Sequence, residues 1–156
     1  MTGPDLHDDL RSVAFLLGTW RGSGHGDYPT IEGFTYDEEI SFTHAGKPFL
    51  FYLQRTWAPD GSPLHSETGY VRPVGADAAE LVIAQPTGIT EIHAGPVEGT
   101  TLRLRSVDVG LAPTAVDVRS TARTITVSGG ELVYRLEMAA VGQPLQFHLE
   151  AKLHRI

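Results

Sequence analysis

Hydrophobic and polar residues alternate along most of the chain with a period of two. In residues 34–44, FTYDEEISFTH, polar residues separate Phe34, Tyr36, Ile40 and Phe42. Such alternation is typical of a strand with one buried and one solvated face. Similar runs recur along the chain, and turn-forming stretches at 58–63, 73–78, 97–100 and 128–131 separate them.

This pattern predicts an all-β fold of about ten short strands with little helix between them. We expect a ten-stranded antiparallel β-barrel, similar to calycins and lipocalins, because closure leaves no unpaired strand edge. Residues 108–118, DVGLAPTAVDV, are the least regular and are predicted to form a loop across one end. The chain shows no repeat, low-complexity tract or linker, so residues 1–156 are predicted to form a single domain.

One short helix is expected before the first strand. Apolar residues recur there at helical spacing, at Leu6, Leu10, Val13, Ala14 and Leu17. Pro4 and Asp5 suit the first turn of this helix, which should end before Gly18.

The amino-acid composition excludes several classes of function. The chain has 41% hydrophobic residues, enough for a core, and no cysteine, which excludes disulfides, thiolate catalysis and Cys-bound zinc. A metal would have to be held by His, Asp, Glu, Tyr or Met. The net charge of −7 argues against a nucleic-acid partner. No apolar run spans a bilayer and the N-terminus is acidic, so we expect no membrane partner and a cytoplasmic location.

The stretch GTWRGSGHG, residues 18–26, places a tryptophan among glycines. A period of two puts Trp20 on one face with Gly18, Gly22, Gly24 and Gly26. Glycines on an inward face make room for a neighbouring strand or for a ligand. Trp20 is expected to close one end of the barrel, with its indole N–H bonded to a nearby acceptor. Alternatively, Trp20 is simply a core anchor and the glycines permit coiling of the strand.

These residues are similar to the nitrobindin family. The motif G-x-W-x-G-x-G is formed here by Gly18, Trp20, Gly22 and Gly24. It is followed in order by YPTI (28–31), HAGKPFL (44–50), LHSETGY (64–70), TGITEI (87–92) and GQPLQFHLEAKL (142–153). The resemblance runs from about Leu16 to the C-terminus.

The resemblance implies a compact ten-stranded barrel that binds one non-covalent haem b per subunit at one end. Family members are described as peroxynitrite isomerases, which form nitrate, and as binders of nitric oxide. The context QP-x-x-x-H-L selects His148 as the axial ligand of a ferric iron and as the catalytic residue. The threonine of YPT, Thr30, and a basic residue 25 positions before the proximal histidine, Arg123, are the implied cofactor contacts. His65 matches a position near the distal side of the pocket.

Strand periodicity conflicts with this role for His148. In LQFHLEAKL the apolar residues Phe147, Leu149 and Ala151 alternate with a polar set that contains His148. Simple alternation therefore directs His148 outward. Haem ligation requires either a β-bulge after Pro144 or an inner wall that becomes polar at the haem end.

Other polar residues have simpler interpretations. His25 and His154 are expected to be exposed, and His44 to form a local hydrogen bond in a turn. Glu38 and Glu39 point to opposite faces of a strand, so they do not form a catalytic pair and are interpreted as part of a solvated surface.

Two other functions remain open at this point. The same residues would serve a non-catalytic sensor or carrier of nitric oxide or haem. A carrier of fatty acids or other apolar ligands would hold a carboxylate with an arginine such as Arg55, Arg103 or Arg135, although each fits better as an outward-facing residue. A homodimer is compatible with a small barrel, but no residue pattern specifies one.

Overall fold

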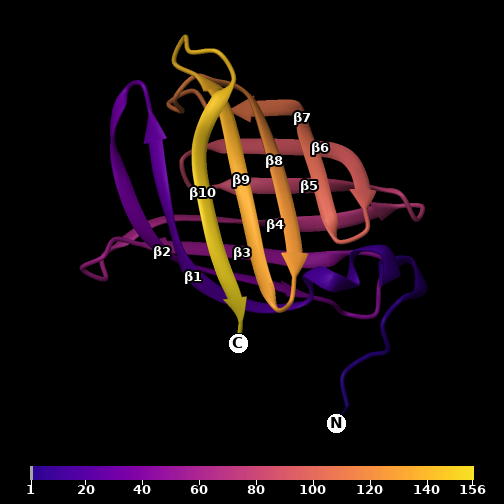
Figure 1. Cartoon of the computed structure of the whole chain (residues 1–156). Coiled ribbons are helices and arrows are strands. Elements are labelled where there is room, and N and C mark those ends of the chain that lie inside the picture. Colours follow the sequence, from indigo (N-terminus) through magenta and orange to yellow (C-terminus); the bar gives the residue numbers. More distant parts are fainter. Residues whose placement is uncertain (1) are drawn as a thin grey trace.

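Ten antiparallel strands close into one barrel in a computed structural model, which describes residues 2–156. Each strand pairs with its neighbours in sequence, and β1 closes the barrel by pairing with β10 as well as β2. The strands are β1 (Gly18–Tyr28), β2 (Ile31–Thr43), β3 (Leu50–Trp57), β4 (Pro63–Val74), β5 (Ala78–Gln85), β6 (Ile89–Glu98), β7 (Thr101–Leu111), β8 (Val118–Ser128), β9 (Glu131–Ala140) and β10 (Gln146–Arg155). In Figure 1, β8–β10 cross in front of β3–β6, so these two groups of strands form opposite walls. The predicted ten-stranded barrel is confirmed.

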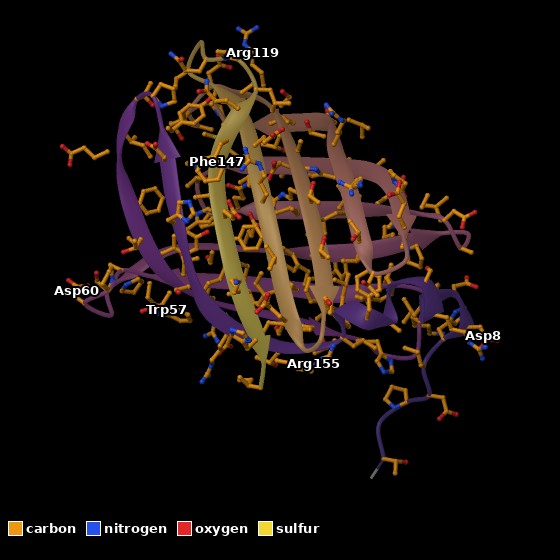
Figure 2. The ribbon with its side chains drawn as sticks, in the orientation of Figure 1. Asp8, Trp57, Asp60, Arg119, Phe147 and Arg155 are labelled. Atoms are coloured by element: carbon orange, nitrogen blue, oxygen red, sulfur yellow. The ribbon has the colours of Figure 1, made fainter. Side chains whose placement is uncertain are left out.

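The connections between strands alternate between two ends of the barrel. We call one end the plug end; it carries η1 (Asp8–Leu16) and the connections at 44–49, 75–77, 99–100 and 129–130. We call the other end the mouth; its connections lie at 29–30, 58–62, 86–88, 112–117 and 141–145. Figure 2 shows Arg119 at the mouth, whereas Asp8 and Arg155 lie toward the plug end.

A short helix and Trp20 fill the plug end. Leu10, Val13 and Leu16 of η1 are buried, and the fully buried Trp20 donates its indole N–H to the Leu16 carbonyl at 2.8 Å. The guanidinium of Arg155 lies 4.4 Å from the centre of the Trp20 ring. The predicted helix, closure by Trp20 and acceptor for its indole are therefore confirmed.

The helix differs from the prediction in its start and type. It is a 3₁₀ helix whose N-cap is His7, and the His7 side chain accepts a hydrogen bond from the Asp9 N–H at 3.1 Å. Pro4 and Asp5 therefore precede the helix instead of forming its first turn. Within residues 2–156, no helix combines the length and apolar character needed to span a membrane.

The glycines of β1 accommodate neighbouring chain segments. A Cβ atom at Gly22 would collide with the backbone of β10, and one at Gly26 would collide with the Phe34 ring. At Gly24 a Cβ would lie only 2.6 Å from the Tyr36 hydroxyl oxygen. The space predicted beside Trp20 is thus taken by β10 and by two aromatic rings from β2.

The predicted loop at 108–118 is shorter in the structure. Residues 109–111 continue β7, because they pair with residues 89–91 of β6. Only 112–117 is a connection, and backbone hydrogen bonds fix both its ends: Ala112 N–H to Gly88 at 2.8 Å, and Val141 N–H to Asp117 at 2.9 Å. The pairing with β6 extends the strand where the sequence alone shows no clear period.

Candidate functional site

The barrel interior holds a cavity of about 730 Å³. This volume lies within the range of small-molecule and cofactor pockets. Ala58, Pro59 and Leu64 line it at the mouth, whereas Leu16 and Phe42 line it toward the plug end. The cavity therefore extends from the mouth deep into the barrel.

A β-bulge in β10 directs His148 into this cavity. Phe147 pairs with Glu137 and Leu149 pairs with Leu136, so His148 is an extra residue without its own partner on β9. His148 and Leu149 consequently both line the cavity. The bulge that ligation by His148 requires is therefore present.

Phe147 lies on the outside of the barrel, before the bulge. Its ring centre is 5.5 Å from that of the exposed His25 and 4.7 Å from the guanidinium carbon of Arg135. Figure 2 shows Phe147 on the part of β10 nearer the mouth. These outer contacts link β10 to β1 and to β9 at the residue just before the histidine that turns inward.

The surroundings of His148 favour a neutral imidazole with one defined tautomer. Its Nδ1 lies 3.3 Å from the carbonyl oxygen of Asp27, and the Tyr28 ring packs edge-on at 5.3 Å. A carbonyl only accepts hydrogen bonds, so Nδ1 carries the proton and Nε2 keeps its lone pair. Burial lowers the pKa of His148 and nearby His65 lowers it further, against the opposing effect of Asp27. A neutral imidazole with a free Nε2 is the form that ligates iron.

His65 lies in the same cavity, whereas Thr30 does not line it. His65 projects from β4, with its Nε2 3.8 Å from Glu67 Oε2. Thr30 is exposed in the turn between β1 and β2 at the mouth. The structure thus brings together His65 and His148, while a cofactor contact by Thr30 stays a prediction.

Arg123 also lines the cavity, but two carboxylates already bind its guanidinium. Nη1 lies 2.5 Å from Glu67 Oε1, and Nη2 lies 2.9 Å from Glu91 Oε2. Burial alone would raise the pKa of Glu67 and Glu91, but Arg123 and further hydrogen bonds outweigh it and hold both well below their usual values. All three groups are therefore charged at neutral pH. Pairing of Arg123 with a haem propionate would replace one of these carboxylates and stays a prediction.

Glu38 lies in a second cluster of buried polar side chains, with Gln54 and Tyr134. Its interpretation as a solvated residue is therefore wrong. It is only 2% exposed, and its Oε2 accepts hydrogen bonds from Gln54 at 2.6 Å and Tyr134 at 3.1 Å. Burial raises the pKa of Glu38 to about 7, despite these hydrogen bonds. Residue 38 has the same parity as Tyr36 and Ile40, which places it on the inner face. Glu39 does point outward, where Arg21 and Arg55 bind it at 2.6 and 2.8 Å.

Sequence analysis also missed a buried group around Glu91. Thr121 donates to Glu91 Oε1 at 2.5 Å, and the fully buried His93 lies 3.3 Å from the same oxygen. Strand parity on β6 gives the signal, because Glu91 and His93 alternate with the exposed Thr90 and Ile92. The inner wall is therefore polar at mid-depth in addition to carrying the bulge.

The possible metal ligands of the cavity suit an iron that a porphyrin already holds better than a free metal ion. Among residues 2–156, no group of three or more His, Asp or Glu side chains is arranged to hold a metal ion. An imidazole with an available Nε2, that of His148, beside a large, mainly apolar cavity is instead the protein contribution typical of a haem site. On this donor chemistry, His148 and the cavity fit haem.

The remaining candidates lie outside the cavity. His25 and His154 are exposed, and His44 accepts a hydrogen bond from Gly46 N–H at 3.2 Å in a turn, as predicted. The exposed Arg55, Arg103 and Arg135 do not line the cavity, so they cannot hold a ligand carboxylate there.

Comparisons with known proteins agree with this geometry. A family model described as "THAP4-like, heme-binding beta-barrel domain" matches residues 9–155. A protein of Mycolicibacterium paratuberculosis named peroxynitrite isomerase 1 is 52% identical, with 97% of each chain covered. A Nocardia farcinica protein named peroxynitrite isomerase is 53% identical over 96% of this chain and 92% of its own length.

A solved structure is also similar over nearly the whole chain. It is the crystal structure of Rv2717c from M. tuberculosis, which has a TM-score of 0.92 and 51% sequence identity. The match covers 97% of this chain and 99% of that one.

Proposed function

Because the chain belongs to the family of THAP4-like haem-binding β-barrels, we propose that it binds haem b at the mouth of the barrel and isomerises peroxynitrite to nitrate. The observation that carries this proposal is the imidazole of His148. A bulge turns it into the cavity, and a backbone carbonyl occupies its Nδ1, so that Nε2 is available for iron. Relatives about half identical to this chain carry the name peroxynitrite isomerase.

When bound, ferric haem would supply the iron whose redox and Lewis-acid chemistry the isomerisation of peroxynitrite to nitrate needs. The protein fixes the ligand that makes this possible. Asp27 holds the proton on Nδ1 and so orients the His148 ring. Leu136, Met138 and Leu149 line the cavity and supply apolar contact for a flat ring system. The same iron would also bind nitric oxide.

We assign His65 to the wall of the pocket and His148 alone to the iron, so that the pocket keeps room for peroxynitrite. The contact of His65 with Glu67 supports this assignment, since the carboxylate oxygen lies 3.8 Å from Nε2. Thr30 and Arg123 are proposed as secondary cofactor contacts, Thr30 from the turn at the mouth and Arg123 from within the cavity.

The haem site is tested by titrating the protein with haemin and following the Soret band. His148→Ala should weaken haem binding more than about 10-fold and change the Soret position. His154→Ala is the matched control, because His154 lies on the same strand but is exposed. A Soret band unchanged by His148→Ala would place the axial ligand elsewhere.

The reaction is tested by mixing the ferric haem protein rapidly with peroxynitrite. Peroxynitrite should decay faster than with the same concentration of free haemin, with a higher yield of nitrate. A rate no greater than that of free haemin would exclude the isomerase and favour a sensor or carrier of nitric oxide.

A further inference from the structure

Two tyrosines from strands that do not pair meet in the cavity. Tyr36 on β2 and Tyr134 on β9 both line the cavity, and their hydroxyl oxygens lie 2.7 Å apart. In the sheet, β1 and β10 lie between β2 and β9. The two side chains therefore reach toward each other across two intervening strands.

Small residues on the intervening strands make this contact possible. Tyr36 pairs with Gly24 on β1, Gly24 pairs with Ala151 on β10, and Ala151 pairs with Tyr134. A Cβ atom at Gly24 would lie 2.6 Å from the Tyr36 hydroxyl oxygen, so a larger residue there would displace the phenol. One glycine of the G-x-W-x-G-x-G motif thus makes room for the tyrosine pair.

The hydrogen bonds of the pair have one direction and end on a carboxylate. While Glu38 is ionised, the Tyr134 hydroxyl donates its only proton to Glu38 Oε2 at 3.1 Å. The Tyr134 oxygen therefore accepts the hydrogen bond of Tyr36. Gln54 donates to the same Oε2 at 2.6 Å and so fixes the carboxylate. The chain of hydrogen bonds runs from Tyr36 through Tyr134 to Glu38.

Glu38 is well suited to take the proton of Tyr134. Burial raises the pKa of Glu38 to about 7, so this carboxylate gains a proton far more readily than an exposed glutamate. A proton on Glu38 also removes a buried negative charge. Burial raises the pKa of Tyr134 well above its usual value, so the phenol gives up its proton only when an electron leaves with it.

The other tyrosines have different surroundings. Tyr52 donates to Glu67 at 2.7 Å, but Arg123 binds this carboxylate. Burial would raise the pKa of Glu67, yet Arg123 outweighs it and keeps this carboxylate ionised. The Tyr28 hydroxyl lies 3.0 Å from a backbone carbonyl, which is too weak a base to take a proton. Tyr70 is exposed on the outside of the barrel. Tyr134 therefore combines access to the cavity with a hydrogen-bonded proton acceptor.

We propose that Tyr134 gives an electron to a one-electron oxidant, nitrogen dioxide, while its proton passes to Glu38. The source of the oxidant rests on the proposed function. Peroxynitrite releases nitrogen dioxide when its O–O bond breaks and the fragments separate before nitrate forms. Tyr134 and His148 line the same cavity, so nitrogen dioxide is set free beside the phenol. Electron transfer requires such proximity but no direct contact.

The step balances in atoms, electrons and charge. The phenolic O–H bond of Tyr134 breaks, and a new O–H bond forms at Glu38 Oε2. One electron passes to nitrogen dioxide, which becomes nitrite. Tyr134 remains as a neutral phenoxyl radical and Glu38 as a neutral acid, whereas loss of the electron alone would leave a buried cation. The pocket thereby reduces an escaped oxidant to nitrite.

The test supplies nitrogen dioxide directly, so its outcome does not depend on whether the protein isomerises peroxynitrite. Electron-pulse radiolysis of a nitrite solution generates nitrogen dioxide around the haem-loaded protein, and the sample is frozen at once for EPR spectroscopy. The unmodified protein should show the signal of a neutral tyrosyl radical, which narrows when the protein contains ring-deuterated tyrosine. Absence of this signal would overturn the inference and leave the proposed isomerase intact.

Substitutions identify the tyrosine and its proton acceptor. Tyr134→Phe removes the phenol and Glu38→Gln removes the group that takes its proton, so each should lower the radical yield about 10-fold or more. Tyr52→Phe is the matched control, because it removes another buried phenol that donates to a carboxylate, and it should leave the yield unchanged. The Soret band and far-UV circular dichroism verify that each variant is folded and loaded. An undiminished yield in Glu38→Gln would overturn the proton transfer.

The hydrogen bond from Tyr36 provides a spectroscopic signature of the radical site. Tyr36→Phe should retain the radical but increase its g-anisotropy in high-field EPR, because the radical oxygen loses a hydrogen bond. A spectrum unchanged by Tyr36→Phe, or a signal that survives Tyr134→Phe, would place the radical on another residue and overturn the assignment to Tyr134.

Discussion

Arg123 Nη1 on β8 lies 2.5 Å from Glu67 Oε1 on β4, although β5, β6 and β7 separate these strands in the sheet. This ion pair therefore crosses the barrel interior instead of linking neighbouring strands. The same guanidinium binds Glu91 on β6 at 2.9 Å. One cation thus connects three strands through the cavity, and the cost of its burial is offset only while its partners remain.

Arg123→Met should destabilise the protein by about 3 to 5 kcal/mol, because two buried carboxylates lose their cation. The free energy of unfolding from urea titration measures this effect. Adding Glu67→Gln and Glu91→Gln to Arg123→Met should restore part of the stability, since no unpaired charge would then remain. A single Arg123→Met variant as stable as the unmodified protein would contradict the role of the cross-barrel ion pair.

Glu38→Gln should stabilise the protein increasingly as pH rises from 4.5 through 7. The folded state raises the pKa of Glu38 from 4.5 to about 7, so the folded protein binds the proton more tightly than the unfolded chain. Ionisation of Glu38 therefore lowers stability, and the difference between variant and unmodified protein should reach about 3 kcal/mol above pH 7. It should vanish below pH 4.5. Urea unfolding across this pH range measures the difference.

Glu39→Gln is the matched control for Glu38→Gln. Hydrogen bonds from Arg21 lower the pKa of Glu39, with burial opposing and Arg55 adding to the effect. Its contribution to stability is therefore present above the unfolded pKa and is lost as pH falls. Glu39→Gln should give no gain of stability at high pH. A gain equal to that of Glu38→Gln would refute the difference between the two faces of β2.

Gly22→Ala should destabilise the barrel by about 3 kcal/mol or more, because its Cβ would collide with the backbone carbonyl of Lys152 on β10. The backbone of β10 is hydrogen-bonded to strands on both sides, so it has little freedom to move away from the added Cβ atom. Gly33→Ala is the control, since the added Cβ would meet only an ordinary contact of 3.7 Å with the Gly26 carbonyl oxygen. Thermal unfolding of both variants compares them, and equal melting temperatures would argue against close approach of β1 and β10.

Tyr28→Phe should loosen the mouth beside His148. The Tyr28 hydroxyl accepts a hydrogen bond from the buried Ala140 N–H at 2.9 Å and lies 3.0 Å from the Met138 carbonyl. Removal of the hydroxyl leaves the amide unsatisfied, at a cost of about 1 to 3 kcal/mol.

Hydrogen exchange measures this loosening directly, as amide exchange at Ala140 should accelerate about 10-fold or more. Tyr70→Phe, which removes an exposed hydroxyl, is the control and should leave this amide unaffected. Unchanged exchange at Ala140 in Tyr28→Phe would show that the hydroxyl does not hold the mouth.

The strands could be predicted because their signal is local. Phe34, Tyr36, Ile40 and Phe42 reveal the period of β2 within a few residues. The same period already placed Glu38 on the inner face. Because glutamate is usually solvent-exposed, Glu38 was interpreted as a solvated residue. Gln54 and Tyr134 supply the hydrogen-bond partners that allow burial of its carboxyl group.

The polar interior could not be predicted, because its partners are far apart in sequence. Nothing near Arg123 indicates that Glu67, 56 residues earlier, lies against its guanidinium. The bulge at His148 was required by the family resemblance and contradicted by simple alternation. Only the pairing of Phe147 and Leu149 with successive residues of β9 reveals where the extra residue lies.

Because η1 and Trp20 fill one end of the barrel, small molecules enter and leave the cavity past the loops at the other end. A flat group held there by His148 would divide the interior from bulk water. The ionised side chains deeper in the cavity, Arg123, Glu67 and Glu91, would then be separated from dissolved salts. Because one end is closed, the loops at the mouth control the exchange of small molecules between the cavity and the solvent.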